Sequence, residues 1–72
     1  MRDLESIRLE LSEFETMRLC DGDGASQEEA GLRMGVSRGT VQRLLKRGRA
    51  KVVQAISESK ALLIEKGDHD ES

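Results

Sequence analysis

The sequence predicts a mainly helical domain of three helices, in which the second and third form a helix-turn-helix and a short strand lies at each end. Three observations predict this fold class. Residues 26–46 contain two helical segments separated by a Gly-Val-Ser tripeptide. Residues 38–57 keep an apolar stripe at helical spacing, which predicts an unusually long third helix. Short apolar patterns at 7–11 and 60–65 are typical of strands.

The N-terminal strand is predicted at Ile7 to Leu11, where apolar and charged residues alternate. These residues could instead extend the following helix. Ser12 and Glu15, however, have the spacing of a capping box, in which the two side chains satisfy backbone N–H groups at a helix start. We therefore expect the first helix to run from residue 13 to about residue 21, where two Asp-Gly pairs favour a turn. Its expected core side chains are Phe14, Met17 and either Leu19 or Cys20.

The second helix is predicted at 27–34, because Ser26 and Glu29 form another capping box. Gly35 follows it, and glycine adopts the positive φ that ends many helices at little cost. Small residues at Ala30 and Gly31 would let the second and third helices approach closely. This combination is typical of a helix-turn-helix and spans residues 26–46.

The third helix is predicted at 38–57, with Ser37 as its N-cap. Its expected inward stripe is Val41, Leu45, Gly48, Val52 and Ile56. The predicted C-terminal strand at 60–65 is followed by Gly67 and a polar stretch, 68–72, that we expect to be disordered, so one domain covers 1–67. The two strands are expected to pair antiparallel, within one chain or between two. Exchange in a homodimer is favoured because an isolated two-stranded ribbon is marginal.

Composition excludes several classes of protein. With one phenylalanine as its only aromatic residue, a chain of 72 residues builds a small core, for which a second copy would be a physical help. No apolar run approaches a membrane span, and the first residues lack the apolar segment of a signal peptide, so a cytoplasmic location is expected. A single cysteine, Cys20, excludes an internal disulfide. We find no catalytic constellation and no metal-ligand spacing, and expect neither enzymatic activity nor a cofactor.

Charge is distributed very unevenly along the chain. The net charge is −2, but residues 30–57 contain seven Lys and Arg and no Asp or Glu, while acidic residues dominate both ends. Such a run often forms only a solvated face. Here it begins where a helix-turn-helix would present its second helix to the major groove of DNA, so the two signals reinforce each other.

The run from Ile7 to Gly67 resembles a bacterial and archaeal family known as domain of unknown function 134, whose members are predicted DNA-binding proteins. The segments that carry the resemblance are SQEEA, MGVSRGT and KALLIE followed by glycine. The central part also resembles the fourth region of sigma-70-type sigma factors, which reads promoter DNA with a helix-turn-helix. The resemblance implies a helix-turn-helix fold and a role in DNA binding.

With the third helix in the major groove, its N-terminal residues and outward face lie nearest the base edges. Arginine pairs bidentately with guanine, glutamine pairs with adenine, and threonine contacts a thymine methyl or a phosphate. The expected base contacts are Arg38, Gly39, Thr40, Gln42, Arg43 and Lys46. Helix N-termini and flanking cations are better placed to hold phosphates. The expected phosphate contacts are Ser26, Gln27, Arg33, Ser37, Arg47, Arg49 and Lys51.

The sequence therefore predicts a small transcriptional regulator that binds specific double-stranded DNA as a homodimer. The alternative is a protein interaction module, because sigma-like helix-turn-helix domains also dock on RNA polymerase. In that case the acidic ends of the chain would suit a basic protein surface.

Overall fold

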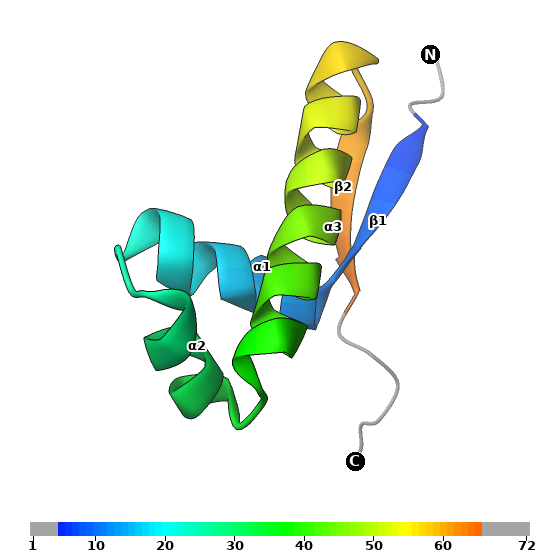
Figure 1. The fold of residues 1–72 in the computed structure, drawn as a ribbon. Helices are drawn as coiled ribbons and strands as arrows, with labels where there is room; N and C mark the ends of the chain where they lie inside the picture. Colours follow the sequence, from blue (N-terminus) through cyan, green and yellow to red (C-terminus); the bar gives the residue numbers. More distant parts are fainter. Residues whose placement is uncertain (1–4, 66–72) are drawn as a thin grey trace.

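The structure, a computed structural model, describes residues 5–65 and is mainly helical. Its elements follow in the order β1 (Ser6–Glu10), α1 (Leu11–Met17), a π-helical turn η1 (Arg18–Gly22), α2 (Gln27–Met34), α3 (Arg38–Ser57) and β2 (Ala61–Glu65). Figure 1 shows α2 on one side of the long α3, both strands on the other side, and α1 crossing behind α3 between them. The predicted fold class, three helices with a long third helix and short flanking strands, is confirmed.

The bounds of α2 and α3 agree with the prediction because the local signals act as expected. The Ser26 hydroxyl accepts the Glu29 backbone N–H at 3.0 Å, and the Glu29 carboxylate accepts the Ser26 N–H at 3.1 Å. Gly35 ends α2 with a φ of 73°. The Ser37 hydroxyl then accepts the Thr40 N–H at 3.1 Å and caps α3.

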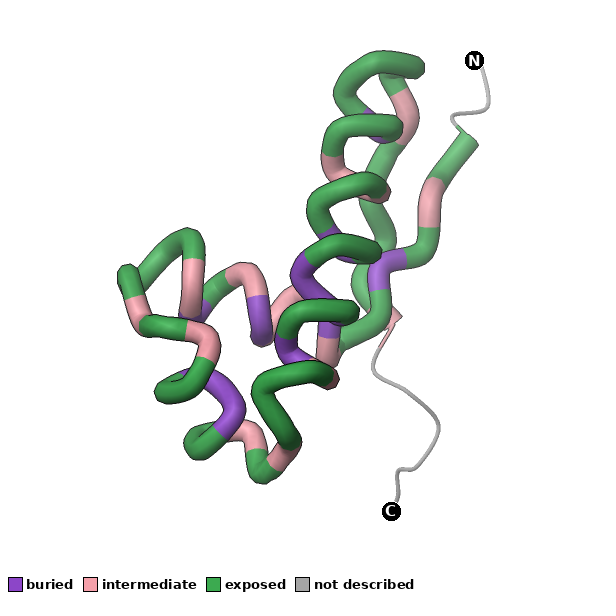
Figure 2. The backbone as a smooth tube through the Cα atoms, in the orientation of Figure 1, coloured by how far each residue is buried: buried purple, intermediate pink, exposed green. Residues whose placement is uncertain are grey.

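The core lies between α3 and the two preceding helices (Figure 2). Its buried members are Leu19, Ala30, Val41 and Leu45, with Met17, Cys20 and Met34 among the residues packed against them. Gly31 allows the turn to approach α2, because a Cβ atom there would lie 2.7 Å from the backbone oxygen of Val36. The same Cβ atom would lie 3.5 Å from Val41 Cγ2 of α3, so the predicted close approach of the two helices is confirmed at Gly31.

The start of the first helix was predicted wrongly. The strand is Ser6–Glu10 and α1 begins at Leu11. The capping box joins Glu10 to Glu13, whose carboxylate accepts the Glu10 N–H at 3.0 Å, and does not involve Glu15. The cause of this difference lies in tertiary contacts. The Glu13 side chain is fully buried beside cations of α3, and in that position its carboxylate can accept the backbone N–H of the N-cap residue.

The helical conformation ends with η1 at Gly22, close to the predicted end. Leu19 is the buried side chain of the predicted pair, Cys20 and Phe14 are half-buried, and Met17 packs against the core.

The apolar stripe of α3 departs from the prediction at its end. Val41, Leu45 and Gly48 are buried, but Ile56 is 74% exposed and Ala55 is buried instead. With about 100° of rotation per residue, Ala55 lies roughly 20° from Gly48 around the helix axis and Ile56 roughly 80° away. The apolar stripe therefore no longer faces the core in the last turn of α3.

The two strands pair in parallel within one chain, with Ile7 opposite Leu62 and Leu9 opposite Ile64. The predicted antiparallel pairing is wrong. Parallel strands need a crossover of a dozen or more residues, and the helices between β1 and β2 provide one. The residues expected to be disordered, 68–72, lie outside the described part of the chain. None of the helices in 5–65 has the length and hydropathy of a membrane span.

Candidate nucleic-acid interface

The N-terminal half of α3 presents its polar side to solvent. Of the six predicted base contacts, Thr40 is half-buried and five are exposed: Arg38, Gly39, Gln42, Arg43 and Lys46. Buried Val41, Leu44 and Leu45 hold the opposite side of the helix on the core. Most of the predicted base contacts are therefore exposed to solvent.

Four cations in this part of the molecule are uncompensated. Among residues 5–65, no carboxylate oxygen lies within 4.0 Å of a charged nitrogen of Arg33, Arg38, Arg43 or Lys46. Each of these residues is exposed. Together with the absence of acidic residues from 30 to 57, this leaves a cationic surface over the α2–α3 corner.

A short hydrogen-bond chain positions Arg43. The Ser37 hydroxyl donates to Thr40 Oγ1 at 3.1 Å, and Arg43 Nη2 donates to the same oxygen at 3.2 Å. The N-cap of α3 is thus linked through Thr40 to the guanidinium one turn further on. This geometry gives Thr40 a supporting contact that the sequence did not suggest.

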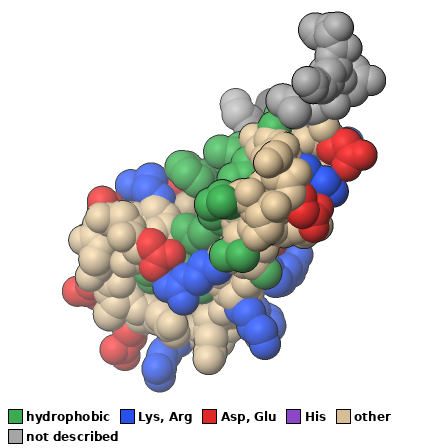
Figure 3. All heavy atoms as spheres, turned by 90° about the horizontal axis from the view of Figure 1, so that it is seen from above, with side chains coloured by type: hydrophobic (Ala, Val, Ile, Leu, Met, Phe, Trp, Pro, Cys, Tyr) green, Lys and Arg blue, Asp and Glu red, His purple; other side chains and the backbone are tan. Residues whose placement is uncertain are grey.

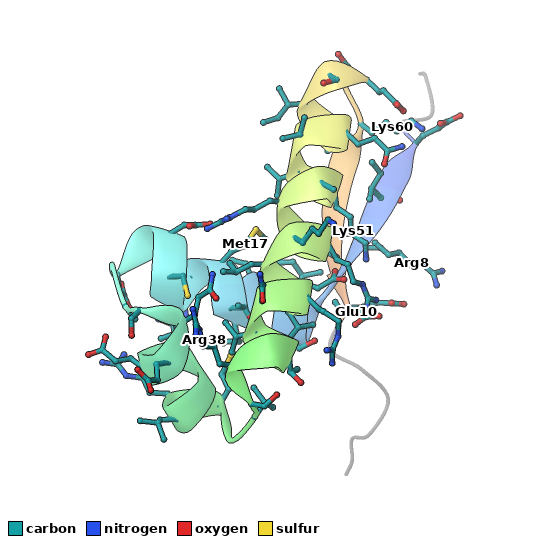
Figure 4. All side chains as sticks on the ribbon, viewed as in Figure 1. Arg8, Glu10, Met17, Arg38, Lys51 and Lys60 are labelled. Carbon is teal, nitrogen blue, oxygen red and sulfur yellow. The ribbon has the colours of Figure 1, made fainter. Side chains whose placement is uncertain are left out.

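The C-terminal half of α3 differs, because its cations meet carboxylates of this chain. Arg49 donates to Asp21 through Nη2 at 2.6 Å and Nε at 3.1 Å. Lys51 donates to Glu13 at 2.8 Å, and Arg47 lies between Glu13 and Glu10 at 3.3 and 3.5 Å. Three predicted phosphate contacts are therefore engaged within the fold. In Figure 4, Lys51 and Glu10 lie on the strand side of α3, whereas Arg38 lies toward α2.

Glu13 is a buried structural residue that the sequence did not single out. It is 0% exposed, and its Oε1 accepts both the Glu10 N–H and Lys51 Nζ. Its Oε2 lies 3.3 Å from Arg47 Nε without a directed hydrogen bond, so the contact with Arg47 is chiefly charge attraction. The available signal was its spacing four residues before Met17, which places it on the inward face of α1.

Two sets of ion pairs also shift the pKa values of their members. The hydrogen bond from Arg49 lowers the pKa of Asp21, and the same bond raises the pKa of Arg49. Just after the C-terminal end of α3, the hydrogen bond from Lys60 lowers the pKa of Glu58. The hydrogen bonds to Glu58 and Glu5 raise the pKa of Lys60. Each shift favours the charged form, so these pairs persist at neutral pH.

The remaining predicted phosphate contacts lie at helix ends. Ser26 and Ser37 are exposed and cap α2 and α3, Gln27 is the half-buried first residue of α2, and Arg33 is exposed in its last turn. No group of three metal-ligating side chains occurs in residues 5–65.

Comparison with known proteins gives a family match over almost the whole chain. The model of "Protein of unknown function DUF134" matches residues 2–72. A UPF0251 protein of Aeromonas salmonicida is 46% identical over 72 residues, which are all of this chain and 71% of that protein. UPF0251 proteins of Thermococcus kodakarensis and Pyrococcus furiosus are 50% and 52% identical over 89% and 81% of this chain. The chain spans only 57% and 54% of those two proteins. No solved structure matches.

Proposed function

The chain belongs to the DUF134 family, proteins of unknown function, and we propose that it is a small transcriptional regulator that binds specific double-stranded DNA through α3. The observation that supports this most is the uncompensated cationic surface over the α2–α3 corner. Cations that have no carboxylate partner among residues 5–65 are available to replace the counterions of a phosphate backbone. As such a regulator the protein would act in the cytoplasm.

The N-terminal half of α3 would enter the major groove. Arg43, held by Thr40, and Arg38 would each read a guanine through O6 and N7, and Gln42 would read an adenine. Gly39 would let the helix approach the base edges, and Lys46 would reach a further base or its phosphate. These contacts would determine sequence preference.

Phosphate contacts would fix the register of the domain on the duplex. Arg33 and the N-termini of α2 and α3, at Ser26, Gln27 and Ser37, are placed for this role. Arg47, Arg49 and Lys51 would contribute less than their charge suggests, because carboxylates of the chain already neutralise them.

The test is selection of bound duplexes from a random pool, followed by fluorescence anisotropy with the selected duplex and a scrambled one over a series of salt concentrations. If all four of the uncompensated cations displace counterions, at phosphates or at the base edges beside them, the slope of log K against log salt is about −3 to −4 per chain. A triple variant, Arg38→Ala, Arg43→Ala and Lys46→Ala, should lose binding while it keeps its helical circular dichroism. If no sequence is enriched and affinity does not depend on salt, the protein is not a DNA-binding regulator.

A second candidate function is docking on another protein such as RNA polymerase. Leu32 is 81% exposed on α2, and the acidic Glu28 and Glu29 are exposed on the same helix. Such a surface would suit an apolar site with a basic rim. Binding to polymerase that is lost in Leu32→Glu, without affinity for free DNA, would favour this function.

A further inference from the structure

An apolar face lies at the end of the molecule away from the α2–α3 turn. We use this name for the exposed side chains Val53, Ile56, Leu62 and Ile64, together with the groove beside them. Figure 3 shows hydrophobic side chains gathered in a band at this end of α3. Four of the seven large hydrophobic residues that are exposed in the described chain belong to this face, which is a strong concentration for so small a domain.

The groove has a volume of about 340 Å³ and nearly all its lining is apolar. Phe14 and Met17 of α1 form one wall, Val52 of α3 forms the other, and Leu62 and Ile64 of β2 contribute from the sheet. Ile56 follows Val52 by one helical turn and extends the second wall outward. A ridge therefore stands directly beside the groove on the same molecule.

Each strand of the two-stranded sheet has a free edge, and the two edges differ in charge. Arg8 and Glu10 put charges on β1, and charged edge strands resist pairing with other chains. The first four residues of β2, Ala-Leu-Leu-Ile, are exposed and uncharged. An edge strand of this kind is a template for another strand, so β2 is the edge on which association is expected.

Each of four cations around the face has at least one carboxylate partner. Arg18 beside the groove pairs with Glu15 and Asp23, and Lys60 before β2 pairs with Glu5 and Glu58. Arg49 and Arg8 are likewise paired, with Asp21 and Glu65. These four cations meet six carboxylates, so the rim has a small excess of negative charge and offers nothing to a polyanion, in contrast to the cationic surface at the α2–α3 corner. The apolar side chains of the face carry no charge that would repel a copy of the same face.

We propose that the apolar face binds a second copy of this chain about a twofold axis. The Val53–Ile56 ridge of each copy would pack into the groove of the other, with the two β2 edges side by side. A stable dimer buries about 800 Å² per copy, which is about a sixth of the 5109 Å² surface of the chain. Both cationic surfaces would stay open, so the dimer neither requires nor obstructs DNA binding.

The experiment is sedimentation equilibrium of the whole chain over a wide range of protein concentrations. The wild type is expected at twice the 8.0 kDa chain mass. Ile56→Glu should sediment as a single chain. Its matched control, Leu32→Glu, adds the same charge at an equally exposed leucine on α2 and should remain dimeric. Circular dichroism of both variants checks that the helices persist.

A second measurement does not depend on a substitution. Backbone amide exchange of the wild type should slow in β2 as concentration rises, because the free edge becomes paired, while exchange in α2 stays unchanged. A wild-type chain that is monomeric at the highest concentration overturns the proposal. So does an Ile56→Glu variant that remains dimeric, or growth beyond the dimer, which a closed twofold interface does not permit.

Discussion

The two halves of α3 carry the same number of cations and use them differently. In the N-terminal half, 38–46, Arg38, Arg43 and Lys46 have no carboxylate partner among the described residues. In the C-terminal half, 47–57, all three cations are held by Glu10, Glu13 or Asp21. One continuous helix thus has a half that is electrostatically available and a half that is neutralised by the fold.

The origin of this difference is the path of the chain before α2. No acidic residue lies on α3, so its partners must come from elsewhere, and β1, α1 and η1 bring carboxylates only to the C-terminal half. A count of charges along the sequence therefore overstates the charge that is free to meet a polyanion. The cations that have no carboxylate partner among the described residues are a better guide to polyanion binding than the total count of cations.

The largest expected effect is on stability and comes from Lys51→Met. The substitution leaves Arg47 as the only cation beside the buried Glu13 carboxylate among the described residues, and removal of one partner of a buried ion pair is strongly destabilising. Because Lys51 is partly exposed and Arg47 remains, we expect a loss near the lower end of the usual range, about 3 kcal/mol in the free energy of unfolding. Urea denaturation followed by circular dichroism measures it.

The matched control is Lys46→Met in the other half of α3. Lys46 is exposed and has no partner among residues 5–65, so stability should change by less than about 0.5 kcal/mol. Similar destabilisation by both substitutions would mean that the two halves do not differ in the way the ion pairs indicate.

The sequence sufficed for the elements that depend on local signals. Ser26 with Glu29, Gly35, and Ser37 each act within a few residues, and the bounds of α2 and α3 follow from them. The open side of α3 also follows from periodicity, because Gln42 and Arg43 lie opposite the buried positions. Fold class and the exposed face of the candidate site were therefore predictable.

What the sequence could not show depends on contacts between distant residues. The spacing of Glu13 places it on the inward face of α1, but the cations that stabilise its buried carboxylate, Lys51 and Arg47, are distant in the sequence, Lys51 by 38 positions. The same holds for Arg49 and Asp21, 28 positions apart. Parallel pairing of the strands was missed for a related reason, since direction depends on how three helices return the chain.

The next largest effect is on DNA affinity and comes from Arg43→Ala. If α3 reads DNA, loss of one bidentate guanine contact should weaken binding to the selected duplex by about 1–3 kcal/mol, with little change for scrambled DNA. Arg49→Ala should cost less and affect both duplexes alike, because Arg49 is engaged with Asp21. Anisotropy titrations with both variants compare the two halves directly, and equal effects on both duplexes would contradict the assignment.

A smaller effect is expected from Thr40→Val, which keeps the shape of the side chain but removes the oxygen that receives Arg43 Nη2. The donor is charged but the bond is exposed to solvent, so we expect the contribution of a typical intramolecular hydrogen bond, about 0.5–1.5 kcal/mol. Discrimination between selected and scrambled duplexes should therefore fall by up to about tenfold. Thr40→Ser retains the oxygen and should restore most of the discrimination. An unchanged ratio in Thr40→Val would show that Arg43 does not need this support.

The smallest effect concerns Asp21, whose side chain is 45% exposed, as its partner Arg49 is 53% exposed. The hydrogen bond from Arg49 holds the pKa of Asp21 below its ordinary value of 3.8. The pair therefore contributes to stability above pH of about 4, and the contribution is lost as the pH falls through the folded-state pKa. In Arg49→Gln, the Asp21 pKa measured by NMR titration should rise toward its ordinary value.

Asp21→Asn at neutral pH should release Arg49 and steepen the salt dependence of DNA binding by at most about one unit of slope. If instead the slope is unchanged while the Asp21 pKa responds as expected, the C-terminal half of α3 lies beyond the reach of the phosphates, and the division between the two halves is set by position on the duplex as well as by charge compensation.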